Sequence, residues 1–191
     1  QERRIVIDPY LSDTLAQKYR DTPHSHARMA PPPVSAEQLG SVDLVLCTHH
    51  HTDHMDGETL QRLAVRQPAL KFVVPAASAF LASQRIGVGL DRLIQVDAGQ
   101  NLDFPGFGLR VMRAAHETLE RNVDGHHRFL GYGLDFGTAR VFHSGDTIPF
   151  SGQSEEIATF APDLALLPVN GRSEALKIAG FAGNFSLAEA I

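Results

Sequence analysis

Four of the ten histidines in this 191-residue sequence lie within six consecutive positions, in the stretch His49, His50, His51, Thr52, Asp53 and His54. In an extended chain, residues two apart point the same way, so His49 and His51 can grip one cation. Asp53 and His54 follow as the chain turns, and they can reach a second cation. Neutral imidazoles suit Zn, Mn and Fe, and a carboxylate adds negative charge.

Two cations about 3.5–4 Å apart let a bridging water lose a proton near neutral pH and become a nucleophile. The pattern therefore predicts metal-dependent hydrolysis. An accidental histidine run or an artificial tag is the alternative, but a tag would not be preceded by an apolar strand and followed by an aspartate and a helix. Alternation points His50 away from its neighbours, so we expect it to support or pack against the site rather than bind metal.

The elements around the histidines should hold them rigidly. The run follows residues 42–47, which are apolar except for Asp43, a composition typical of a strand buried on both faces. A helix is expected over 58–66, where apolar residues recur at helical spacing. The ligands would then lie at the carboxyl end of a strand, where loops converge on a substrate. Cys47, which precedes the run, is expected to be a small buried core residue.

Strand and helix patterns alternate near both ends of the chain, with consecutive strands between them. This order predicts an α/β fold of two sheets packed together and flanked by helices. The stretch 8–33 is expected to be a long loop, which either is a mobile connection or borders a binding site. Strands are expected at 3–7, 42–47, 71–74, 93–96, 102–104, 107–115, 129–136, 140–143 and 164–169, and helices at 58–66, 76–85 and 155–160.

Composition limits the class of protein. With 43% hydrophobic and 20% charged residues, the chain should be globular, and its length fits one domain. The formal net charge of -5 argues against a nucleic-acid partner. No apolar run approaches the roughly 18–20 residues that span a bilayer, so no membrane partner is expected. The one cysteine excludes an internal disulfide and suits a cytoplasmic location, and a homo-oligomer is compatible with the sequence.

The run His49, His51, Asp53 and His54 after a hydrophobic strand resembles the His-x-His-x-Asp-His signature of the metallo-β-lactamase superfamily. The later motifs of that superfamily also have counterparts here, in order. A histidine at the end of a strand is matched by His116, and the aspartate of a Ser-Gly-Asp-Thr turn is matched by Asp146.

The resemblance implies a four-layer αββα metallo-β-lactamase sandwich with two divalent metal ions. It assigns His49, His51 and His116 to the first metal and Asp53 and His54 to the second, with Asp146 as the bridging ligand. Asp8, in Ile7-Asp8-Pro9, resembles the aspartate that supports the site without binding metal. A plain turn residue is the alternative for Asp8.

Softer patterns at 7–13, 131–133, 142–147, 167–172 and 183–190 resemble the L-ascorbate-6-phosphate lactonase group. That branch implies hydrolysis of a small anionic lactone or ester, such as a sugar-lactone phosphate, by a metal-bound hydroxide. Zn or Mn is the expected metal, and Fe also fits. Asp53 or Asp146 would carry a proton toward the leaving alkoxide.

Substrate contacts are less specific in the sequence. Asn170 and Arg172 follow a strand and could bind an anionic group, the arginine as a two-pronged donor. His126, His127 and Arg128 could do the same, and for each of these residues a solvated loop is the alternative. His24 and His26 receive no role.

The chain also departs from the family pattern. The family has a last metal-binding histidine, which would lie beyond Ile191, and a pair of strands before the strand at Ile5. We therefore expect residues 1–191 to form a single domain that lacks N- and C-terminal parts.

Three other functions remain open from the sequence. A phosphodiesterase like the phospholipase D-like or nuclease-like members would use the same metals. A di-iron oxidoreductase is disfavoured because such relatives have Glu where this chain has His51. A non-catalytic metal-binding protein would be expected only if the last ligand were absent.

Overall fold

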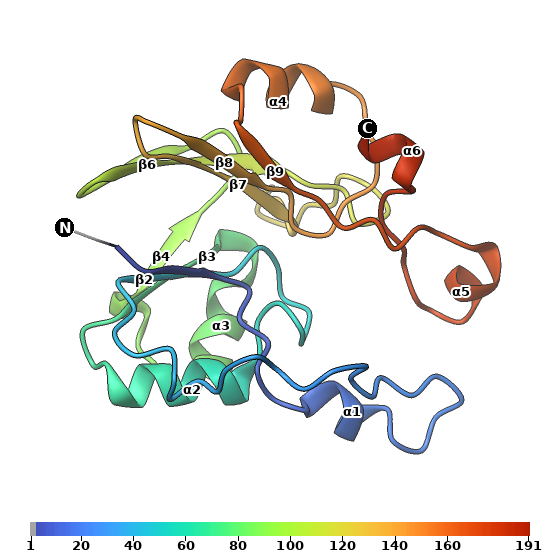
Figure 1. The fold of residues 1–191 in the computed structure, drawn as a ribbon, viewed down its shortest axis with the longest axis horizontal. Helices are drawn as coiled ribbons and strands as arrows, with labels where there is room; N and C mark the ends of the chain where they lie inside the picture. Colours follow the sequence, from blue (N-terminus) through green and yellow to red (C-terminus); the bar gives the residue numbers. More distant parts are fainter. Residues whose placement is uncertain (1–2) are drawn as a thin grey trace. The chain divides into compact units, whose positions relative to one another are not determined.

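The computed structural model describes residues 3–191, and it divides into two compact units. The first unit contains residues up to Val74 together with Ser78–Gln95, and the second contains Pro75–Ala77 together with Val96–Ile191. Each unit is built around one sheet (Figure 1). Among the described residues, no helix is both long enough and apolar enough to traverse a bilayer.

The sheet of the first unit has the order β1-β2-β3-β4. These strands are β1 (Ile5–Ile7), β2 (Leu44–Leu46), β3 (Lys71–Pro75) and β4 (Leu93–Val96). β2 runs parallel to both of its neighbours and is completely buried, as its continuous apolar run predicts. Because parallel strands end at the same edge of a sheet, the segments that follow β1 and β2 emerge next to one another.

Two helices, α2 (Gly57–Arg66) and α3 (Ala79–Ile86), accompany this sheet. Leu60 and Leu63 of α2 and Ala82 of α3 belong to the same buried cluster as Val45 and Phe72 of the strands. α3 ends at Gly87, which adopts the left-handed conformation (φ 73°) that commonly terminates a helix. A single apolar core therefore fixes the strand before the histidine run and the helix after it.

The stretch 8–33 was expected to be entirely loop, but it contains the short helix α1 (Thr14–Lys18). None of the residues of α1 is buried, so the helix leaves no apolar periodicity for a sequence pattern to reveal. The guanidinium of Arg28 holds the stretch together, because it donates hydrogen bonds to the carbonyls of Tyr10 and Ser12 and lies 4.0 Å from the Tyr10 ring centroid.

The sheet of the second unit has the order β5-β6-β7-β8-β9. Its first four strands are antiparallel neighbours, whereas β8 and β9 are parallel. The strands are β5 (Asn101–Phe104), β6 (Phe107–Arg113), β7 (Leu130–Asp135), β8 (Arg140–His143) and β9 (Leu164–Leu166). The expected α/β fold with two sheets is thus confirmed, although β6 and β9 end earlier than the sequence indicates.

Helix α4 (Gln153–Phe160) packs on the second sheet through Phe160, which forms a buried cluster with Met112 and Phe142. Gly133 of β7 makes this close approach possible, since a Cβ there would lie 2.8 Å from Cζ of Phe160. Two short helices follow, α5 (Glu174–Ile178) inside the expected loop and α6 (Leu187–Ala190). Helix α6 begins with a capping box between Ser186 and Glu189.

Candidate metal centre

Residues 48–55, called the histidine loop below, are anchored at both ends. The backbone N–H of Cys47 donates to the carbonyl of Val73 at 2.9 Å, which extends the β2–β3 ladder to the edge of the loop. The chain then turns, and the N–H of Met55 donates to the carbonyl of His51 at 2.8 Å. α2 begins at Gly57 directly afterwards. The loop is therefore a short, hydrogen-bonded connection between two core elements.

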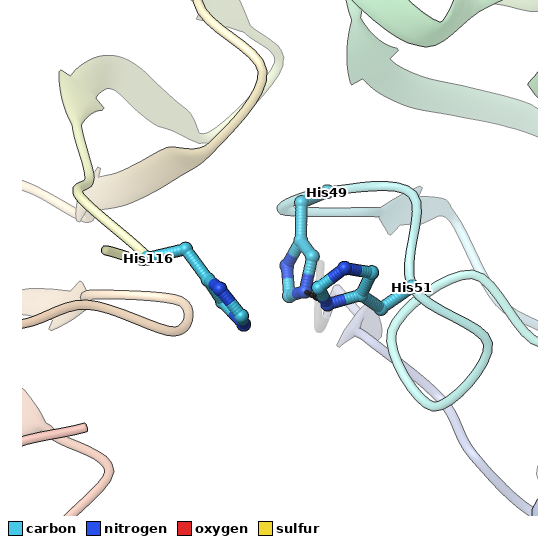
Figure 2. Close-up of side chains that lie close together, drawn as sticks. All are labelled: His49, His51 and His116. Atoms are coloured by element: carbon cyan, nitrogen blue, oxygen red, sulfur yellow. Dashed lines mark hydrogen bonds between the residues drawn. The ribbon is translucent and has the colours of Figure 1, made fainter. Parts of the chain in front are cut away.

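The side chains of His49 and His51 face each other, as their two-residue spacing predicts (Figure 2). Nε2 of His49 lies 3.0 Å from Nδ1 of His51, and the ring centroids are 4.6 Å apart. His49 is fully buried and His51 is half-buried. Two ring nitrogens directed at one point form a donor pair that fits a single cation.

Asp8 organises the other side of these rings. Its carboxylate accepts hydrogen bonds from Nδ1 of His54 at 2.7 Å and from the N–H and hydroxyl of Thr48 at 2.7 and 2.6 Å. Since the Thr48 hydroxyl donates to Asp8, its oxygen accepts from Nδ1 of His49 at 3.0 Å. Both imidazoles therefore carry the proton on Nδ1 and direct the Nε2 lone pair outward, as a metal ligand requires. This geometry favours a supporting role for Asp8 over that of a plain turn residue.

The backbone of Asp8 is itself unusual, because its φ of 46° lies in the left-handed region. Aspartate tolerates this conformation better than most residues do. The N–H of Asp8 donates to the carbonyl of Leu46 at 2.9 Å, which holds the turn against β2. The backbone thus helps to hold the Asp8 carboxylate in place.

Asp53 and His54 also converge, with Oδ2 of Asp53 3.6 Å from Nε2 of His54. The Asp53 side chain is 42% exposed, whereas that of His54 is 15% exposed. The ring of His50 lies edge-on to His49, with the centroids 6.4 Å apart. It also lies 4.9 Å from the ring centroid of His51, and its expected supporting or packing role stays a prediction.

The donor set of the loop fits a divalent cation of intermediate hardness. It offers three imidazoles and one exposed carboxylate, a combination that suits Zn, Mn or Fe. The one cysteine adds no thiolate, because Cys47 is completely buried and burial raises the pKa of its thiol well above the usual range.

The second unit holds the other two expected ligands close together. His116 extends from the segment after β6 (Figure 2), and its Nε2 lies 3.8 Å from Oδ2 of Asp146 in the turn after β8. The His116 ring stacks on Phe129 with the centroids 4.8 Å apart. Gly145, at a φ of 60°, gives the turn the shape that presents Asp146.

Two hydrogen bonds join the segments that carry His116 and Asp146. The N–H of Ala115 donates to Oγ1 of Thr147 at 3.0 Å, and the N–H of Ile148 donates to the carbonyl of Ala115 at 2.8 Å. Thr147 is fully buried, so these bonds are shielded from water. The residues next to each expected ligand thus fix the spacing of the pair.

A pocket of about 270 Å³ lies beside His116 in the same unit. It is lined by His116, Glu117, Ile148, Arg172, Ser173, Glu174, Lys177 and Gly183. Asn170, which we expected to contact substrate, is exposed and lies outside this lining. Sequence analysis missed Lys177, because a lysine in a short exposed helix carries no distinguishing pattern.

Arg172 reaches the pocket but is already paired. Its terminal nitrogens donate to the carboxylate of Glu189 and to the carbonyl of Asn184. The hydrogen bonds to Glu189 raise the pKa of Arg172, and hydrogen bonds from Arg172 and Ser186 together lower the pKa of Glu189 to about 2. A substrate anion would have to compete with Glu189 for this guanidinium. In the described residues, by contrast, no hydrogen bond or ion pair engages the Lys177 ammonium.

Three further histidines, His127, His126 and His26, make structural contacts. His127 is buried, and its N–H and Nδ1 both lie 2.8 Å from Oδ1 of Asp97. The N–H of His126 donates to the side chain of Asn122 within the same hairpin loop. His26 stacks on Tyr19 with the centroids 4.1 Å apart. The pairing with Asp97 ties the loop of His127 to the segment that follows β4.

Comparison with known proteins places this chain in a family. Residues 3–191 match the model of the β-lactamase superfamily domain. A metal-dependent hydrolase from Sulfolobus acidocaldarius is 28% identical over 172 residues, which cover 90% of this chain and 66% of the relative. The N-acyl-phosphatidylethanolamine-hydrolyzing phospholipase D 1 of Caenorhabditis elegans is 27% identical over 177 residues, covering 87% of this chain and 48% of that protein.

Among solved structures, a possible metal-dependent hydrolase from Veillonella parvula superposes with a TM-score of 0.73 at 23% identity. The match covers 96% of this chain and 71% of that one, and it shows a shared fold. The chain spans no more than about two thirds of the length of the curated relatives described above. The family model and the shared fold confirm the metallo-β-lactamase fold expected from the motifs, and the chain belongs to the β-lactamase superfamily.

Proposed function

We propose that this chain is a metal-dependent hydrolase with a centre for two divalent ions, Zn, Mn or Fe. The observation that carries the proposal is the facing pair of ring nitrogens on His49 and His51, beside a His54 ring held by Asp8. Asp53 and His54 supply the second position. His116 and Asp146 are assigned to the same centre because their motifs follow in the order typical of the family.

The proposed substrate is a small lactone or ester with an anionic group, as the lactonase-like motifs imply. The pocket beside His116 supports a small substrate by its size. Lys177 is its available cation, whereas Glu117 and Glu174 add carboxylates to the same lining. This mixture suits a substrate with one anionic group and several hydroxyls that can donate to the two glutamates.

Bound divalent metals would supply an activated water and polarise the scissile carbonyl. The residues of the chain orient the metal ligands and carry the proton. Asp8 and Thr48 keep the Nδ1 protons on His54 and His49, so that their Nε2 atoms remain ligands. Asp53, whose side chain is 42% exposed, would pass a proton to the leaving alkoxide, and Asp146 is the alternative carrier.

The proposal is tested by measuring the rates at which the metal-loaded chain hydrolyses L-ascorbate-6-phosphate, simple lactones and carboxylic esters. Metal content is measured on the same samples by elemental analysis. We expect His51→Ala to lose about one metal equivalent and nearly all activity. His24→Ala, which removes an imidazole from the stretch 8–33, is the matched control and should retain both. Metal-loaded protein without activity on any of these substrates would contradict the proposal.

Phosphodiester hydrolysis is the second candidate, and the similarity to the Caenorhabditis elegans phospholipase D supports it. The net charge of -5 favours a small or lipid-derived diester over a nucleic acid. Rates on bis-p-nitrophenyl phosphate, measured beside the lactones, separate the two candidates. A higher kcat/KM for the diester would replace the lactonase proposal.

A further inference from the structure

Arg85, in the last turn of α3, reaches the histidine loop from a different element. Its Nη1 donates to the carbonyl of His50 and to the carbonyl of Met55, the latter at 3.3 Å. These two carbonyls flank the segment that carries His51, Asp53 and His54. One guanidinium nitrogen therefore ties together both ends of the segment that bears three of the expected ligands.

The charge of Arg85 strengthens this contact. Burial lowers the pKa of Arg85, while the nearby carboxylate of Asp56 acts in the opposite direction. An arginine in a protein remains protonated even so. Hydrogen bonds from a charged donor are roughly twice as strong as those between neutral groups, and partial burial shields them from competing water. The loop carbonyls are thus held by a strong donor rather than by solvent.

The path of this side chain depends on a glycine. A Cβ at Gly57, the first residue of α2, would lie 3.0 Å from Cγ and 3.2 Å from the carbonyl oxygen of Arg85. Such contacts are tighter than ordinary van der Waals distances, so a side chain at this position would require Arg85 to move by a few tenths of an ångström. The start of α2 is therefore shaped to let Arg85 pass to the loop.

We propose that Arg85 is a positioning residue for the metal centre. By holding the backbone of the histidine loop, it directs the ring nitrogens of His51 and His54 toward the metals. This role rests on the proposed metal-dependent function. It assigns to Arg85 no contact with substrate or metal. Its effect is transmitted through the carbonyls of His50 and Met55.

The test measures Zn²⁺ affinity by competition with a chromophoric chelator, and the absorption spectrum of the Co²⁺-substituted chain. Arg85→Gln should raise the Kd by about tenfold or more, the size of effect typical of residues that orient metal ligands, and should alter the Co²⁺ spectrum. Arg85→Lys keeps the charge and should restore part of the affinity. Arg62→Gln removes an arginine that forms only surface ion pairs with Glu58 and Glu37, and it should match wild type.

Gly57→Ala provides an independent variant that keeps Arg85 itself. Alanine favours a helix more than glycine does, so this change should not weaken α2. We expect it to raise the Kd for Zn²⁺ in the same direction, and it decides the question if Arg85→Gln fails to fold. If both metal-free variants unfold at lower temperature but bind Zn²⁺ within twofold of wild type, Arg85 only stabilises the fold and the proposal is wrong. A wild-type chain that binds no metal would instead overturn the proposed function.

Discussion

The carboxylate of Asp8 lies 2.7 Å from Nδ1 of His54, although the two residues are 46 positions apart in the chain. The hydroxyl of Thr48 links the same carboxylate to Nδ1 of His49. One carboxylate thus sets the orientation and the tautomer of two imidazoles. The parallel pairing of β1 with β2 brings it there, because both strands end beside the histidine loop.

Replacing this carboxylate by an amide should weaken metal binding more than it weakens the fold. Asn shares the tolerance of Asp for a left-handed backbone, so Asp8→Asn should fold normally. The loss of the charged acceptor should raise the Kd for Zn²⁺ by about 10–100-fold. Chelator competition measures this effect, and Asp13→Asn, which changes an exposed carboxylate in the same stretch, is the control. An unchanged Kd would show that Asp8 acts only as a turn residue.

The thiol of Cys47 should be inert in the folded protein. The side chain is completely buried, and burial raises its pKa, so almost no reactive thiolate forms at pH 8. We expect no reaction with Ellman's reagent under native conditions and one thiol per chain after denaturation in guanidinium chloride. Rapid labelling of the native chain would mean that the carboxyl end of β2, where Cys47 lies, opens readily.

The pair of Asp97 and His127 should contribute stability that depends on pH. Burial acts to raise the pKa of Asp97, but the hydrogen bonds from the N–H and ring of His127 outweigh it and leave the pKa below the usual value. A carboxyl with a lowered pKa stabilises the fold above its unfolded pKa of about 3.9, and this contribution is lost as the pH falls through the folded value. Asp97→Asn should therefore be less stable than wild type at pH 7.

Urea unfolding at several pH values measures this difference, which should shrink as the pH falls from about 4 toward 2. Asp103→Asn, which changes an exposed carboxylate of the same unit, should show no such trend. If the difference in free energy of unfolding between wild type and Asp97→Asn stays constant down to pH 2, the ionised Asp97 carboxylate is not its source.

A methyl group at Gly133 should force α4 away from its sheet. The added Cβ would lie 2.8–2.9 Å from three atoms of the Phe160 ring, so Gly133→Ala should lower the free energy of unfolding by about 1–3 kcal/mol. Phe160→Leu removes ring atoms from the same space. The double variant should therefore lose less free energy of unfolding than the sum of the losses of the two single variants. Additive effects in urea unfolding would show that the two residues do not compete for space.

Much of the candidate site could be predicted from the sequence because four of its six expected ligands lie close together in the chain. The two-residue spacing of His49 and His51 sufficed to predict their facing rings, and the apolar run before them predicted the buried strand. His116 and Asp146 required the family pattern, since a single histidine or a single aspartate in a glycine turn has no spacing to interpret.

Contacts between distant segments were beyond the reach of pattern analysis. Thr48 links Asp8 to His49, but its sequence position shows only a polar residue at the end of a strand. Arg172 was a candidate for binding an anionic group, with a solvated loop as the alternative, and its pairing with Glu189 depends on how the chain folds back between them. Helices α1 and α5 bury none of their residues, so hydrophobic periodicity could not predict them.

The topology of the two sheets also has a consequence for the order of folding. β5 to β8 pair with successive neighbours as antiparallel strands, so their contacts close short segments of chain. β1 must instead pair with β2 although Asp8 and Thr48, which follow these strands, are 40 positions apart in the chain. Because closing a longer segment costs more entropy before contacts form, this parallel pairing should come later. The histidine loop would then acquire its orienting carboxylate among the last steps, and a newly made chain would become competent for metal only when folding is nearly complete.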